Sequence, residues 1–172
     1  MRDVRPLVLA YRIGLRVSAR PAAQAPLLRE IDVWDIEGIC DPERFFGLVG
    51  ALVPDATHLY VEGTSIAATA QAVFQRHSEP GAFLPGRQTI WPSSNKYRCT
   101  FSAGLLKDLQ EAASSLAQPE LLDHLFIYRE TNSLVQWHDA FSTAMLIADE
   151  IPEARVAALA AAFGLTYDLA RF

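Results

Sequence analysis

The stretch HLFIYRETNSLVQWHD, residues 124–139, decides the fold. It places two short apolar runs, His124–Glu130 and Leu134–Asp139, on either side of the connection Thr131-Asn132-Ser133. Such runs, joined by a few turn-forming residues, predict a β-hairpin. With Asn132 at the centre of the turn, one face of the hairpin is apolar throughout, and we expect it to face the core. Its members are Leu125, Ile127, Val135 and Trp137.

The other face of this hairpin carries two histidines. Its members are His124, Phe126, Tyr128, Gln136 and His138. In the predicted register the histidines are diagonal neighbours, roughly 7–8 Å apart, which is too far for a hydrogen bond but close enough for a shared ligand. One interpretation makes His138 or His124 the general base of an enzyme. The other treats both as ordinary half-exposed side chains. Asp139 is not expected to orient the His138 ring, because neighbours in a strand point to opposite faces.

The pattern continues outward in both directions as short strands and amphipathic helices. Asp41 is expected to cap a helix that Pro54 ends, and Thr64 or Ser65 to cap the next one. The other expected elements are strands at 27–36, 58–62 and 144–149 and helices at 102–117 and 152–164. Strands that are adjacent in sequence at both ends of the chain, with helices between them, predict an α+β fold.

We therefore expect residues 1–172 to form a single α+β domain. Its sheet is expected to be mixed but largely antiparallel, with about four helices packed mainly on one face. Residues 1–6 and 166–172 are expected to fray.

The N-terminal stretch Leu7–Val17 alternates strictly between apolar and other residues. This period of two predicts a half-buried strand, and the arginines within it argue against a secretory signal. A hairpin centred near Ala22 would place Arg12 opposite Asp32.

Composition excludes several classes of protein. The chain has 172 residues, of which 51% are hydrophobic and 20% charged, as expected for a core-forming domain. No apolar run approaches the roughly 20 residues of a membrane span. Cys40 and Cys99 are too few for a disulfide framework or a zinc knuckle, so a reduced, cytoplasmic protein is expected. Nucleotide-binding, metalloprotease and nucleophile-elbow motifs are absent, and we expect neither a metal nor a cofactor.

Charge is distributed unevenly along the chain. Residues 1–29 carry six arginines and one aspartate, whereas residues 30–172 carry nine cationic and nineteen acidic side chains. An acidic body disfavours nucleic acid and anionic membranes as partners and favours a basic protein. The oligomeric state is left open.

Six carboxylates cluster between residues 30 and 43 without an intervening cation. Four of them, Glu30, Asp32, Asp35 and Glu37, are candidate partner-binding residues on an acidic face. The other interpretation is structural: Asp41 and Glu43 favour a helix start, and Arg12 and Arg16 neutralise the strand carboxylates.

Residues 78–98 lack regular periodicity, and a loop of this length is typically functional or mobile. Its candidate partner-binding residues are Arg87, Trp91 and Tyr97, since arginine and aromatic side chains dominate binding hot spots. The alternative is a lid packed over the core.

The leading hypothesis is a non-enzymatic module that binds a basic protein, for example an antagonist or immunity-type protein acting on a basic toxin or nuclease. The competing hypothesis is a small hydrolase or transferase with a pocket beneath the 79–98 loop and His138 or His124 as general base.

Overall fold

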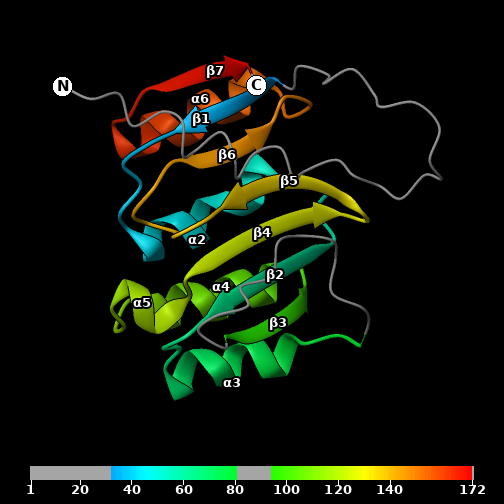
Figure 1. Cartoon of the computed structure of the whole chain (residues 1–172), viewed down its shortest axis with the longest axis vertical. Helices are drawn as coiled ribbons and strands as arrows, with labels where there is room; N and C mark the ends of the chain where they lie inside the picture. The colour runs from blue at the N-terminus through cyan, green and yellow to red at the C-terminus, as the bar shows by residue number, and fades with distance from the viewer. Residues whose placement is uncertain (1–31, 81–93, 172) are drawn as a thin grey trace.

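The computed structural model describes residues 32–80 and 94–171 (Figure 1). The predicted strand Leu7–Val17 and three candidate binding residues, Glu30, Arg87 and Trp91, lie outside this part of the chain.

The described strands form one sheet in the order β3-β2-β4-β5-β6-β1-β7, and all six pairings are antiparallel. The strands are β1 (Asp32–Ile36), β2 (His58–Gly63), β3 (Asn95–Thr100), β4 (His124–Arg129), β5 (Asn132–Trp137), β6 (Met145–Ala148) and β7 (Tyr167–Arg171). The predicted α+β class is confirmed.

The helices lie mainly behind one face of this sheet (Figure 1). They are α2 (Pro42–Leu52), α3 (Ala68–His77), α4 (Ala103–Ala113), α5 (Gln118–Leu121) and α6 (Glu153–Phe163). The predicted capping by Asp41 is confirmed, because its side chain accepts a hydrogen bond from the Arg44 amide at 3.0 Å. Gly164 ends α6 with a φ of +68°, a left-handed conformation that favours glycine.

The predicted cap of α3 is wrong. The helix begins at Ala68, and Ala67 at its N-cap supplies no side-chain hydrogen bond. Thr64 does not cap this helix, because its amide and its hydroxyl both donate to Asp123 at 2.8 Å. This contact fixes the end of β2 against the start of β4.

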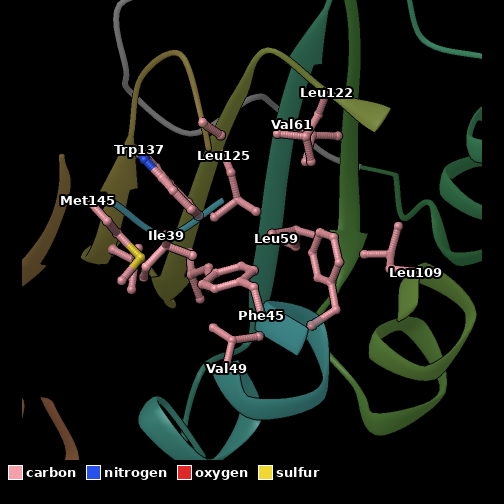
Figure 2. Packing of buried hydrophobic residues seen from close by; sticks show 14 of the residues in the cluster. Ile39, Phe45, Val49, Leu59, Val61, Leu109, Leu122, Leu125, Trp137 and Met145 are labelled. Carbon is pink, nitrogen blue, oxygen red and sulfur yellow. The ribbon is translucent and has the colours of Figure 1, made fainter. Parts of the chain in front are cut away.

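The core lies between the sheet and the helices. Phe45 and Val49 of α2 reach towards Leu59, Leu125 and Trp137 of the strands (Figure 2). Trp137 is fully buried, as predicted, and its ring centroid lies 5.1 Å from that of Phe45. Its indole N–H donates to the Thr143 carbonyl at 2.9 Å, so the buried donor is satisfied.

The hairpin keeps the predicted faces but not the predicted register. Leu125 pairs with Trp137, and a bulge follows between Ile127 and Tyr128. Arg129 then pairs with Asn132, so the connection consists of residues 130 and 131, not the predicted Thr131-Asn132-Ser133. A shift of two residues preserves which side chains share a face, because the period of a strand is two.

The 78–98 loop is shorter than predicted. Its last part forms β3, which pairs with β2, and Ser78 forms an isolated bridge with Cys99. Tyr97 lies within β3, and its ring stacks on Phe74 of α3 with centroids 5.2 Å apart. Tyr97 is therefore partly packed against a helix.

The C-terminus contradicts the expectation of fraying. Tyr167–Arg171 forms β7, which pairs with β1 on the side away from β6. Both sides of β1 are thus occupied, so Asp32–Ile36 has no side left for the predicted hairpin with residues 7–17. Among the described residues, the cation beside Asp32 is Arg171, with Nε 2.9 Å from Oδ1, and the predicted partner Arg12 lies outside them.

Candidate functional site

The sheet face opposite the helices carries a group of polar side chains from β2, β3 and β4. Strand alternation places His58, Tyr60 and Glu62 of β2 on this face, since Leu59 and Val61 enter the core on the other. The register sets Glu62 between Lys96 of β3 and His124 of β4. The described helices lie mainly behind the other face, so we call this one the helix-free face.

Glu62 lies near the end of β2 on the helix-free face and is fully buried. The Tyr60 hydroxyl donates to its Oε1 at 2.5 Å, and the Ser94 hydroxyl donates to its Oε2 at 3.3 Å. Tyr60, Phe126 and Tyr128 form a small buried cluster beside it. Burial, together with the neighbouring carboxyl group, raises the pKa of Tyr60 and raises that of Tyr128 to about 12. Both phenols therefore stay protonated at neutral pH.

A second network holds His58 at the end of the same face. Arg98 donates from Nη2 to His58 Nε2 at 3.2 Å, which leaves His58 Nδ1 facing Glu79 Oε1. Glu79 also accepts from Arg98 Nε at 2.8 Å and from the Thr100 hydroxyl at 3.0 Å. Burial opposes ionisation of Glu79, but these donors outweigh it and lower the pKa of the carboxyl group. Because Arg98 faces the lone pair of Nε2, His58 is poorly placed to act as a base.

The rings of the two hairpin histidines lie against each other. Their ring centroids are 5.5 Å apart, and the ring of Phe126 packs against His138 at 5.1 Å. Asp139 orients His124: its backbone amide, at a φ of +46°, donates to His124 Nδ1 at 3.0 Å. Neutral His124 must then carry its proton on Nε2, so its lone pair is already used.

The predicted acidic residues do not share one face. Asp32 and Asp35 lie on opposite faces of β1, because their separation in the strand is odd. Asp32 is bridged to Arg171, whereas Asp35 pairs across the ladder with Asp168 of β7. Glu37 follows the strand and is exposed.

Two residues of β7 were missed by sequence reasoning. Asp168 is exposed opposite Asp35, and Leu169, 51% exposed, is the large hydrophobic side chain that the described residues leave most open to solvent. A signal was present, because Leu165, Tyr167 and Leu169 alternate with period two. We define Asp35, Glu37 and Asp168 as the acidic edge.

Within residues 32–80 and 94–171, no three His, Cys, Asp or Glu side chains are grouped to hold a metal ion. No helix in this part of the chain is long and apolar enough to cross a membrane. Comparisons with protein-family models, curated proteins and solved structures find no match to the chain.

Proposed function

We propose that the chain is a non-enzymatic binding module whose acidic edge docks a basic protein. The observation that carries this proposal is the pairing of Asp35 with Asp168 across the last two strands of the sheet. This pairing joins Asp168 of β7 to Asp35 and Glu37 at one edge of the sheet, and a group of carboxylates attracts a cationic partner. An antagonist or immunity-type role against a basic toxin or nuclease is the concrete form of this proposal.

The wider charge distribution supports the same proposal. The described residues carry eighteen Asp and Glu against eight Lys and Arg. Several of those cations are already paired within the chain: Arg171 with Asp32, Arg98 with Glu79, and Arg129 with both Asp55 and Glu150. A net negative field of this kind speeds the approach of a basic partner, and salt weakens it.

Three of the four histidines make contacts within the chain that weaken the case for a general base. His58 Nε2 faces Arg98 Nη2 at 3.2 Å, and His77 Nε2 lies 2.9 Å from Asp108 Oδ2 in a contact between α3 and α4. His124 uses its Nδ1 to accept the Asp139 amide. A general base needs an accessible lone pair within reach of a substrate proton.

The test is affinity capture from native lysate with mass spectrometry. The bait is the intact chain, compared with a variant carrying Asp35→Asn, Glu37→Gln and Asp168→Asn. A control variant carries Glu43→Gln, Glu111→Gln and Glu130→Gln, which neutralise three exposed carboxylates away from the edge. We expect a basic protein to be captured by the intact chain and the control and lost with the edge variant. Equal capture by all three baits would contradict the proposal.

A second candidate function rests on the contact between the rings of His124 and His138. His124 lies opposite Glu62 in the pairing of β4 with β2. In this interpretation the chain is a small hydrolase or transferase with His138 as general base, since the lone pair of His124 already accepts the Asp139 amide. It is tested with nitrophenyl ester and phosphoester substrates. Turnover by the intact chain that His138→Ala abolishes would support the enzyme, and turnover that survives this change would exclude His138 from the role.

A further inference from the structure

Strand β7 is the outermost described strand on its side of the sheet. Among the described residues it pairs with β1 alone, along all five of its residues (Figure 1). The outer side of such a strand presents a row of backbone N–H and C=O groups, which is a template for pairing with another chain.

The inner contacts of β7 hold it at both ends. The Tyr167 hydroxyl donates to Glu153 Oε1 at 3.0 Å, and its ring meets Trp34 edge-on with centroids 5.8 Å apart. At the other end, Arg171 is bridged to Asp32. A strand fixed in this way loses little conformational freedom when a partner pairs with it, which favours binding.

Three devices that often protect an edge strand, lysine, proline and a bulge, are missing from β7. Its sequence, YDLAR, contains no proline and no lysine, and its ladder with β1 runs without a bulge. Arg171 is a cation, but it is committed to Asp32. Leu169 and Asp168 are both exposed, and they point to opposite faces of the sheet.

We propose that an extended basic segment of the partner protein adds to the sheet along the outer side of β7. Its backbone pairs with the strand, an apolar side chain covers Leu169 on the helix side, and a lysine or arginine faces Asp168 on the helix-free face. The segment therefore alternates apolar and basic residues. This inference rests on the proposed function, and it specifies how the basic partner is recognised.

The test uses the full chain and a blocked peptide of alternating lysine and valine residues. Binding is measured by isothermal titration, and amide hydrogen exchange locates it. We expect the peptide to slow exchange at residues 167–171. Asp168→Lys should weaken binding at least tenfold, whereas Glu111→Lys, the same charge change on an exposed helical residue, should leave it within twofold. A peptide of alternating glutamate and valine should not bind.

A third peptide separates strand pairing from simple charge attraction. It has the lysine–valine sequence with alternate backbone nitrogens methylated, so that it keeps its charge but cannot pair as a strand. Strand addition requires this peptide to lose binding. If it binds as well as the unmodified peptide, the inference fails while the proposed function stands. The proposed function is tested separately, by whether the acidic-edge variant loses capture of a basic protein from lysate.

Two further outcomes would overturn the inference. Slow amide exchange at 167–171 in the free chain, unchanged by peptide, would mean that the outer side of β7 is already covered. Concentration-dependent dimers in sedimentation, abolished by Leu169→Lys, would assign this edge to a second copy of the chain.

Discussion

At the residue scale, the buried carboxyl group of Glu62 depends on the hydroxyl of Tyr60. Tyr60→Phe removes that donor and leaves a buried acceptor short of a partner, so we expect the free energy of unfolding to fall by about 1–3 kcal/mol. Urea unfolding monitored by circular dichroism measures the change. Tyr128→Phe is the matched control, because Tyr128 is as buried but its hydroxyl makes no hydrogen bond within the described residues. Equal losses for both variants would mean that the hydrogen bond adds nothing.

Glu79 makes the stability of the chain depend on pH. Because its pKa is lowered below 4.5 in the folded chain, the unfolded chain binds the proton first as the pH falls. The stability that Glu79 contributes is therefore fully present above pH 4.5 and is lost as the pH falls through the folded pKa. Glu79→Gln should reduce stability at pH 7 by about 1–3 kcal/mol, because charge-assisted hydrogen bonds are lost.

The pH profile distinguishes this effect from simple damage to the fold. Between pH 5 and pH 3, the free energy of unfolding of Glu79→Gln should fall less steeply than that of the unaltered chain. Other acids with lowered pKa values, such as Asp55 and Asp108, remain in both proteins and cancel in the comparison. Parallel profiles would show that Glu79 is not the titrating group.

At the scale of a single element, the end of α6 requires a glycine. Gly164 has a φ of +68°, and a side chain in this left-handed region costs about 1–2 kcal/mol. Gly164→Ala should destabilise the chain by that amount. Gly104→Ala is the control: in α4 the added methyl carbon would lie at an ordinary 3.7 Å from His77 Cε1, and alanine is favoured in helices by about 0.5–1 kcal/mol. The two substitutions should shift the thermal midpoint in opposite directions.

Sequence reasoning succeeded where local chemistry determines an element. Asp41 and Gly164 mark helix ends through their own side chain or backbone, and the period of two revealed the faces of the hairpin. It failed where an element depends on pairing with distant strands. In β3 the alternation is short, with only Tyr97 and Cys99 apolar, so the strand was not separated from the loop that precedes it.

The same limit applies to the candidate site. Asp35 and Glu37 were visible in the sequence as part of an acidic run, but Asp168 joins them only because β7 pairs with β1. Glu62 was passed over as one residue of a short buried strand. Its importance comes from Tyr60 two residues away and from Ser94 beyond a helix, contacts that depend on the sheet.

At the scale of the whole molecule, one continuous hydrophobic cluster joins the sheet to the helices. It extends from Ile36 on β1 through Trp137 on β5 to Cys99 on β3, close to the opposite edge. Shared burial of this kind couples distant parts of a fold, so the predicted single domain should unfold in one transition. The two ends of the sheet offer independent reporters of this behaviour.

Cys99 reports on the β3 end, because its thiol is fully buried and burial raises its pKa to about 12. Folded Cys99 should therefore be inert to a thiol reagent, whereas the unfolded thiol, with a pKa near its usual value of about 8.5, should react readily. Cys40→Ser removes the exposed thiol, and Trp91→Phe restricts fluorescence to Trp34 on β1 and Trp137 on β5. In a urea titration of this double variant, Cys99 labelling, tryptophan fluorescence and circular dichroism should share one midpoint. Labelling of Cys99 at a urea concentration where the fluorescence is still native would show that β2 and β3 open separately, and the single-domain prediction would then be wrong.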